Sequence, residues 1–289
     1  MKCCLRCEAQ YESDAWHCPS CGHEPDIIEG FPAFAPELAS DSGGFDAALY
    51  DELARLETRN FWFRSRNRLI AWALKRYFGG ARNFLEIGCG TGYVLSGVAA
   101  ALPALKLFGS DMSSHGLGHA SKRVPQAELM QMDARQIPFA GEFEVIGAFD
   151  VIEHIEDDRR VLRQIHRALA LNGGVLLTVP QHPFLWSEYD VRARHVRRYR
   201  ARELKEKMVE AGFEIIKMTS FVALLLPLMA LSRFAQRAPK DHYNPLGEFR
   251  LHPMLNAVLE KTLDLERGLI RAGVSLPAGG SLLLVARKR

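Results

Sequence analysis

The sequence predicts an α/β fold, with a doubly wound and mostly parallel sheet preceded by a small cysteine-rich unit. From about residue 83 onward, short apolar segments alternate with amphipathic segments of helical periodicity, a pattern typical of strand–helix–strand units. The 289 residues suffice for one such domain with an appendage. The 48% hydrophobic and 25% charged residues are ordinary for a globular protein, and a net charge of +3 is too small to indicate nucleic-acid binding.

The N-terminal segment contains two C-x-x-C pairs, formed by Cys4, Cys7, Cys18 and Cys21. Four thiolates suit a tetrahedral zinc ion, and a unit this small has too little core to fold alone. We therefore predict a zinc ribbon with structural zinc over residues 1–26, in which Cys3 could replace Cys4. A redox pair or a disulfide staple is the alternative. The first 25 residues lack the apolar core of a signal peptide, which favours the cytoplasm and reduced cysteines.

Residues 27–44 are rich in proline, glycine and serine and predict a linker. Residues 45–78 carry apolar side chains at helical spacing, so we expect one or two amphipathic helices there. Within them, residues 61–67 read FWFRSRN. Three consecutive aromatic side chains on a helix cannot all face one core, so some should cap a ligand cleft or line a pocket; packing against the sheet is the alternative.

Residues 83–95, NFLEIGCGTGYVL, carry the strongest functional signal. An apolar strand containing Glu86 is followed by a turn with Gly88, Gly90 and Gly92, and then by an apolar helix. Alternate glycines let the backbone turn sharply and approach a ligand, while the helix directs its free N–H groups toward that ligand. This predicts a nucleotide-type site. A dinucleotide fingerprint would place its third glycine at position 93, which is Tyr93, so an NAD site is not favoured.

Two further strands end in acidic residues downstream of this turn. LKLFGSD ends in Asp111, where a carboxylate can accept both hydroxyls of a ribose, and Met112 beside it could pack on an adenine face. AELMQMDA places Asp133 and Ala134 after a third strand. A single aspartate at a strand end is usually a helix cap or a turn former. Three such features in register favour a ligand site.

These motifs resemble motif I and the following elements of the class I S-adenosylmethionine (SAM) dependent methyltransferases. DVIEHI, residues 150–155, is similar to a motif of the ubiquinone and menaquinone methyltransferases, in the methyltransferase type 11 group. The resemblance implies a seven-stranded Rossmann-like sheet over residues 45–289, with the last strand antiparallel. It also implies SAM as the cofactor. The implied SAM-binding residues are Glu86, Gly88, Cys89, Gly90, Gly92, Asp111, Met112, Asp133, Ala134 and Phe149.

Methyl transfer is an in-line displacement, so a base is needed only for an acceptor that must lose a proton. The catalytic candidates are His154, His195 and Glu153, although a single histidine more often makes a structural hydrogen bond. Asp150, Glu153 and His154 also resemble the E-x-x-E-H element of ubiquinone O-methyltransferases and small-RNA 2′-O-methyltransferases, which implies a divalent ion at these residues, with His195 at about the place of the later histidine of that element. Asp150 is one methylene shorter than the family's glutamate, and helix capping by Asp150 and Glu153 is the alternative.

Two insertions are expected beyond the carboxyl ends of strands, where substrates bind in such folds. The first, residues 182–199, begins a stretch with six arginines between residues 192 and 202, some of which should enter the cleft beside His195 if they bind an anionic acceptor. The second, residues 220–280, begins with an apolar run at residues 221–231, FVALLLPLMAL. This run is too short to cross a bilayer, but it could form a buried helix, a lid or a peripheral membrane contact.

The predicted function is SAM-dependent methylation of oxygen or carbon in a small apolar, anionic or lipid-linked acceptor. An RNA methyltransferase that uses the zinc ribbon and the arginine-rich stretch is the first alternative. A SAM-binding regulator without turnover is the second. The chain has Asp150-Val-Ile-Glu153 where amino-directed nucleic-acid methyltransferases usually have an [DN]-P-P-[YFW] tetrad.

Overall fold

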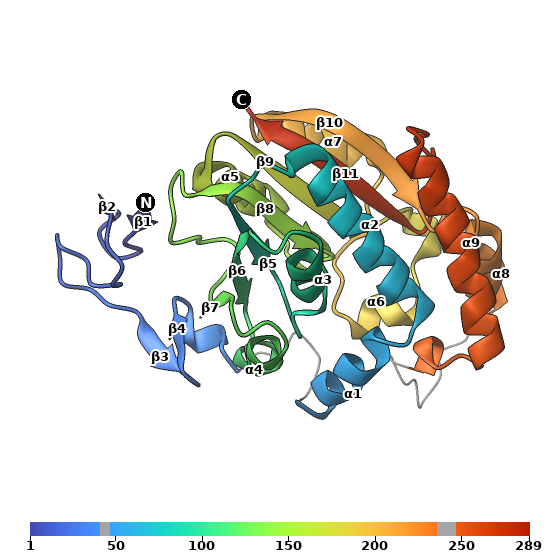
Figure 1. The fold of residues 1–289 in the computed structure, drawn as a ribbon, viewed down its shortest axis with the longest axis horizontal. Helices are drawn as coiled ribbons and strands as arrows, with labels where there is room; N and C mark the ends of the chain where they lie inside the picture. The colour runs from blue at the N-terminus through green and yellow to red at the C-terminus, as the bar shows by residue number, and fades with distance from the viewer. Residues whose placement is uncertain (41–46, 236–246) are drawn as a thin grey trace.

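The computed structural model of the protein describes residues 1–40, 47–235 and 247–289. Its centre is a nine-stranded sheet in the order β10-β11-β9-β8-β5-β6-β7-β4-β3 (Figure 1). Seven of these strands form the predicted doubly wound sheet, and β11 runs antiparallel to both β9 and β10, as predicted. The seven strands are β5 (Asn83–Ile87), β6 (Lys106–Asp111), β7 (Glu128–Gln131), β8 (Phe143–Phe149), β9 (Leu169–Pro180), β10 (Phe213–Phe221) and β11 (Ser281–Lys288).

Helices cover both faces of this sheet (Figure 1). Because successive strand residues point to opposite faces, Phe84 and Leu85 of β5 enter two different apolar cores. The core around Phe84 includes side chains of α2 (Phe61–Phe78), α3 (Tyr93–Ala101), α4 (Ser114–Arg123) and α9 (Pro253–Arg271). The core around Leu85 includes side chains of α5 (Asp158–Ala168) and α7 (Ala201–Glu210). Strand β5 pairs with β8 on one side and β6 on the other, and so lies in the middle of the sheet. Ligands bind beyond the carboxyl ends of such central strands in open α/β sheets.

The prediction of a linker over residues 27–44 is wrong for residues 27–33, which form strands and a turn. Strands β3 (Asp26–Ile28) and β4 (Phe31–Ala33) form an antiparallel hairpin, whose turn uses Gly30 with a φ of 87°. Strand β4 pairs in parallel with β7 and so extends the sheet. The buried side chain of Gln131 fixes this junction, since its amide bonds to the backbone N–H and C=O of Ala35 at 3.0 and 2.7 Å. A short turn of helix, η1 (Pro36–Leu38), follows, and residues 41–44 lie outside the described part.

The cysteine-rich unit lies at one end of the molecule (Figure 1). Backbone hydrogen bonds join residues 1–3 to residues 138–140. The ring of Trp16 packs against Phe34 and Phe139, with centroid separations of 4.5 and 5.4 Å. The unit is thus docked on the sheet rather than tethered by a linker. Its strands are β1 (Lys2–Cys3) and β2 (Gln10–Tyr11).

Both predicted insertions follow strands that end at the same edge of the sheet. The first follows β9 and forms η3 (Pro183–Leu185) and α6 (Glu188–Arg192). The second follows β10 and contains α8 (Leu226–Ala235), η4 (Gly247–Phe249) and α9. Helix α1 (Ala47–Glu57) and the short helix η2 (Ile152–His154) complete the described helices. Within the described ranges, no helix is long and apolar enough to cross a membrane.

Candidate active site

The glycine-rich turn connects β5 to α3 at the carboxyl edge of the sheet. Gly88, Gly90 and Gly92 have φ angles of 69°, 51° and 74°, a region that side chains disfavour. A Cβ atom on Gly88 would lie 2.4 Å from a methyl carbon of Val151. A Cβ atom on Gly90 would meet no atom of the described chain within 4 Å. The backbone at Gly90 is therefore open to a ligand.

The Asp111 carboxylate, at the end of β6, holds this turn. Its two oxygens accept hydrogen bonds from the backbone N–H groups of Gly90 at 2.8 Å and Ser113 at 2.9 Å. Burial raises the pKa of Asp111, and these backbone hydrogen bonds offset part of the rise. The acid predicted to bind ribose is thus oriented beside the glycine-rich turn, with lone pairs left for a ligand.

The other residues predicted for the adenosine half of the cofactor also follow β6 and β7. The Met112 carbonyl accepts a hydrogen bond from the Gln131 amide at 2.9 Å. Asp133 pairs with Arg135 at 2.8 Å, and Ala134 is buried. Their contacts with adenosine stay a prediction.

A cavity of about 500 Å³ opens beside the glycine-rich turn. The turn contributes Gly88, Cys89 and Gly90, and the adjacent strand ends contribute Glu86 and Phe149. As predicted for the FWF sequence, Phe61, Trp62 and Phe63 line the cavity. Further apolar walls come from α1, η4, α9, α8 and the residue before α8, with Leu53, Leu225, Leu228, Met229, Phe249 and Leu259. The cavity therefore joins the predicted cofactor turn to a largely apolar chamber.

Two charged side chains lie buried between the turn and this chamber. Glu86 is 2% exposed, and its Oε2 has no hydrogen-bond partner among the described residues. Burial raises the pKa of Glu86 well above its usual range, and the charge of Arg66 offsets part of the rise. Arg66, from α2, pairs with Asp150 at 2.6 Å and lies over the Trp62 ring. An unfilled buried acceptor of this kind predicts a ligand that donates hydrogen bonds to Glu86.

The three catalytic candidates meet at the polar end of the cavity. One potential ligand atom each from Glu153, His154 and His195 lies within 4.8 Å of the other two. Glu153 is fully buried, and neither of its oxygens has a partner among the residues described. Burial and the nearby Asp150 charge raise the pKa of Glu153 well above its usual range. Burial, followed by the His195 imidazole, lowers the pKa of His154 to about 4, which leaves His154 neutral.

Of the residues predicted for a divalent ion, Glu153, His154 and His195 form this cluster, and Asp150 is not part of it. Asp150 instead pairs with Arg66, because that buried guanidinium requires an anionic partner. The alternative of helix capping by Asp150 and Glu153 is wrong. Helix α5 is capped by Asp157, whose side chain accepts a hydrogen bond from the N–H of Arg160 at 3.0 Å.

His195 is oriented by a fully buried carboxylate. Its Nδ1 lies 2.8 Å from Oδ1 of Asp190, which also accepts a hydrogen bond from Nε of Arg198 at 2.8 Å. The backbone N–H of Ser187 donates to the other oxygen of Asp190 at 2.8 Å. Burial opposes ionisation of Asp190, but the hydrogen bond with His195 and the charge of Arg198 lower its pKa to about 2. An ionised Asp190 keeps the proton on Nδ1 of His195 and leaves Nε2 as the free basic nitrogen.

The arginine-rich stretch does not place several cations in the cavity. Of its six arginines, Arg198 lines the cavity, where it pairs with Asp190. Three others pair with carboxylates at 2.6–2.8 Å: Arg192 with Glu188, Arg197 with Asp158, and Arg202 with Glu206. Helix α6, which contains Arg192, lies apart from the cysteine-rich unit (Figure 1). A continuous basic surface for RNA is therefore not favoured.

Sequence reasoning missed three residues that shape the site: Glu57, Arg66 and Asp190. Glu57 ties α1 to the glycine-rich turn, because its Oε2 accepts hydrogen bonds from Thr91 at 2.6 Å and Arg123 at 2.8 Å. Ser187-x-x-Asp190 is a capping-box pattern and could have placed Asp190 at a helix start. Arg66 follows Trp62 by four residues and so shares its helix face. No local pattern indicates the partner of Glu57.

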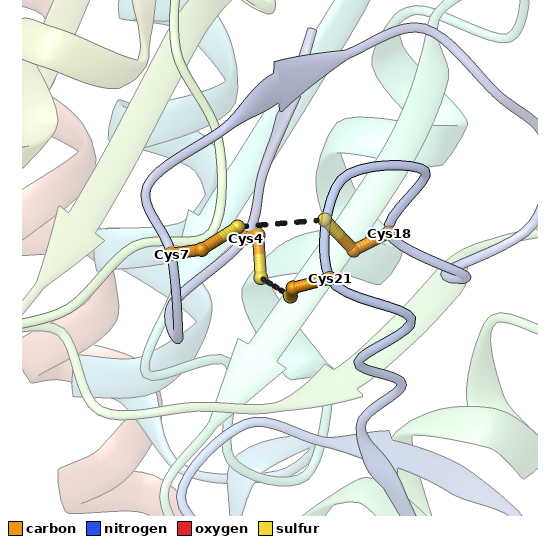
Figure 2. A group of neighbouring side chains, drawn as sticks. All are labelled: Cys4, Cys7, Cys18 and Cys21. Carbon is orange, nitrogen blue, oxygen red and sulfur yellow. Dashed lines mark hydrogen bonds between the residues drawn. The ribbon is translucent and has the colours of Figure 1, made fainter.

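The four predicted zinc ligands come together in the N-terminal unit (Figure 2). The Sγ atoms of Cys4 and Cys21 lie 3.7 Å apart, and those of Cys7 and Cys18 lie 3.6 Å apart. All four sulfur atoms lie within 4.8 Å of one another. Cys3 is not part of this group and directs its thiol to the carbonyl of Glu8. The geometry thus favours Cys4 over Cys3.

Comparisons with known proteins agree with this architecture. A "Probable S-adenosylmethionine-dependent methyltransferase" of Mycobacterium tuberculosis is 30% identical over 166 residues, covering 56% of this chain and 59% of the relative. A demethylmenaquinone methyltransferase of Chlorobaculum parvum is 30% identical over 100 residues, covering 34% and 41%. The chain therefore spans less than two thirds of these relatives. The solved structure of a SAM-dependent methyltransferase from Thermotoga maritima shares the fold, with a TM-score of 0.52, 20% identity, and coverage of 84% and 97%.

The likeness extends to a defined family. Residues 51–218, from α1 into β10, match the profile of the methyltransferase domain. This match covers more than half of the chain and includes the glycine-rich turn, Asp111, Asp133 and the Glu153–His195 region. The chain therefore belongs to the methyltransferase domain family.

Proposed function

We propose that the chain transfers a methyl group from SAM to a hydroxyl oxygen of a small, largely apolar acceptor. One observation carries this proposal: a single cavity joins the glycine-rich turn and Glu86 to the cluster of Glu153, His154 and His195. The SAM-dependent methyltransferase among the relatives supports the cofactor. The demethylmenaquinone methyltransferase supports an apolar acceptor, which also fits the aromatic and leucine-rich walls.

The residues present fit SAM. The unpartnered oxygen of Glu86 would accept hydrogen bonds from the ammonium group of the methionine part, beside the open backbone at Gly90. Asp111 would bind the ribose, while Met112, Asp133 and Ala134 would contact the adenine. Bound SAM supplies an electrophilic methyl group on a sulfonium. The protein's own task is to align the acceptor oxygen with that group and to exclude water.

In this proposal His195 is the general base. As the acceptor oxygen forms its bond to the methyl carbon, the carbon–sulfur bond breaks and the hydroxyl proton moves to Nε2 of His195. Asp190 is a positioning residue, since its carboxylate holds Nδ1 of His195 at 2.8 Å and stabilises the imidazolium that forms. The sulfonium becomes a neutral thioether, so the charges balance.

A divalent ion held by Glu153, His154 and His195 is a second candidate for the same cluster. Two features favour it: the three ligand atoms converge, and the buried Glu153 oxygens have no partner among the described residues. A neutral His154 and an Asp190 carboxylate behind His195 also suit a metal site. Such an ion would lower the pKa of an acceptor hydroxyl and orient it. We also propose that Cys4, Cys7, Cys18 and Cys21 bind a structural zinc.

Methyl transfer from radiolabelled SAM into a quinone- and lipid-rich extract tests the proposed reaction. His195→Asn should lower turnover at least about 100-fold while SAM affinity, measured by calorimetry, stays within about twofold. His166→Asn on α5 is the matched control and should leave both unchanged. Full turnover by His195→Asn would reject the general base. Turnover that stops with a chelator, and returns with Mg²⁺ or Mn²⁺, would assign the cluster to the second candidate.

A further inference from the structure

Helix α9 carries apolar side chains on two opposite faces. Its inner face packs into the core through Leu259, Leu263 and Ile270. Its outer face carries Met254, Val258, Leu265 and Leu269, which are 38–74% exposed. Successive members of this outer set are four, seven and four residues apart, a spacing that forms one stripe along a helix. A surface helix is usually polar toward water, so the outer stripe of α9 requires an explanation.

Exposed apolar side chains also occur on helix α8 and in the residues before it. Leu224, Leu228 and Leu231 are 43%, 55% and 68% exposed. Leu228 also lines the cavity, together with its neighbour Met229 and with Leu259 of α9. Figure 1 places α8 and α9 at the same end of the molecule, opposite the cysteine-rich unit. The exposed leucines are therefore continuous with the wall of the proposed acceptor chamber.

The acidic side chains of α9 are engaged within the protein, and Arg267 of the same helix pairs with Asp264 at 3.1 Å. The protein engages all three acids: Glu260 and Asp264 pair with Arg68 at 2.6 and 3.2 Å, and Glu266 accepts hydrogen bonds from the N–H groups of residues 222–224. Lys261 and Arg271 are exposed and have no ion-pair partner within the described ranges. Lys261 lies between Val258 and Leu265 on the outer stripe. The outer stripe thus combines apolar side chains with the unpaired positive charge of Lys261, and Arg271 adds a second exposed cation at the C-terminal end of the helix.

We propose that α8 and α9 form a docking face for an anionic lipid bilayer and that the acceptor enters the cavity from this bilayer. Leucines of the face would enter the interface, while Lys261 and Arg271 would meet anionic headgroups. A second copy of the chain fits less well. A two-fold contact through the same stripe would bring cations of both copies together in a desolvated interface. Entry of the acceptor from the bilayer rests on the proposed function, because that function identifies the chamber as the acceptor site. Binding of the face to the bilayer does not depend on it.

Sedimentation with vesicles tests this docking face directly. Vesicles of phosphatidylcholine mixed with phosphatidylglycerol should bind the protein more tightly than phosphatidylcholine alone. Leu231→Asp combined with Leu265→Asp should weaken binding to the mixed vesicles by at least about tenfold. Lys261→Ala and Arg271→Ala should each weaken binding about fivefold, and only on the anionic vesicles. Leu171→Asp is the matched control, because Leu171 is 82% exposed at the opposite edge of the sheet.

The same variants separate failure of docking from failure of the proposed function. The double leucine variant should keep its SAM affinity and should transfer methyl groups normally to a detergent-solubilised lipid extract, but not to intact vesicles. Absence of vesicle binding by the wild type, or equal binding by the double leucine variant, would overturn the proposal. The proposal would also be overturned if the wild type were a dimer, the double leucine variant were a monomer, and neither bound vesicles. That result would assign the face to self-association. The lysine and arginine variants provide an independent test should the aspartate variants misfold.

Discussion

Glu86→Gln is expected to have opposite effects on SAM binding and on the stability of the ligand-free protein. The carboxylate is 2% exposed and one oxygen lacks a partner among the described residues, so a bound ammonium would gain a charge-assisted hydrogen bond. Loss of such a bond costs about 1.5–3 kcal/mol, which corresponds to an increase of about 10- to 150-fold in the SAM dissociation constant.

The sign of the stability change follows from the pKa. Burial raises the pKa of Glu86 well above its usual range, so the folded state binds this proton more tightly than the unfolded state. Protonation of Glu86 therefore contributes to the free energy of unfolding at low pH. This contribution falls as pH rises from the unfolded pKa of Glu86, about 4.3, through its raised folded pKa. Glutamine does not ionise, so Glu86→Gln should stabilise the ligand-free protein relative to the wild type at alkaline pH.

Calorimetry in two buffers of different ionisation enthalpy measures both affinity and proton release. Below the folded pKa of Glu86, wild-type SAM binding should release a proton, because the ligand's ammonium favours the carboxylate. Glu86→Gln should lose this release. Glu128→Gln is the control, since Glu128 is 57% exposed on β7. An affinity within about twofold of wild type, with unchanged proton release, would refute the role of Glu86.

Two further predictions concern structural residues. Cys4→Ser should lower bound zinc well below one ion per chain, whereas Cys3→Ser should retain it; equal zinc contents by elemental analysis would contradict the assigned cluster. Asp158→Asn should lower the free energy of unfolding by about 3 kcal/mol at neutral pH, because the variant leaves Lys207 without its buried carboxylate. Burial opposes ionisation of Asp158, but hydrogen bonds, led by that from Lys207, lower its pKa. The difference in free energy of unfolding between wild type and Asp158→Asn should therefore shrink as pH falls from the unfolded pKa of Asp158, about 3.9, through its lowered folded pKa. A difference that does not change with pH in urea unfolding would argue against this origin.

The sheet and its glycine-rich turn could be predicted because their signals are local. Apolar runs marked β5, β6 and β8, and the alternate glycines marked the turn between β5 and α3. The hairpin of β3 and β4 was missed because each strand has three residues and Pro32 interrupts the second. So short an element is stabilised mainly by its pairing with β7 and by the distant Gln131 side chain. Its sequence alone therefore gave a weak signal.

The candidate site was less predictable because its electrostatics depend on distant partners. Arg66 meets Asp150 across 84 positions of the chain, and this pairing changes which residues are left to form the histidine cluster. The arginine-rich stretch looked available for an anion because the local sequence does not reveal its acidic partners. Asp158 and Asp190, on two different helices, neutralise Arg197 and Arg198 in the folded protein.

The most direct test of O-methylation in this cavity uses SAM with a ¹³C-labelled methyl group. The protein would be incubated with this SAM and a lipid extract, and NMR would identify the atom that carries the label. We predict a labelled methyl ether on an amphipathic product, formed by the wild type and lost in His195→Asn although that variant still binds SAM. Label on nitrogen or carbon, or SAM binding without any labelled product, would contradict O-methylation in this cavity.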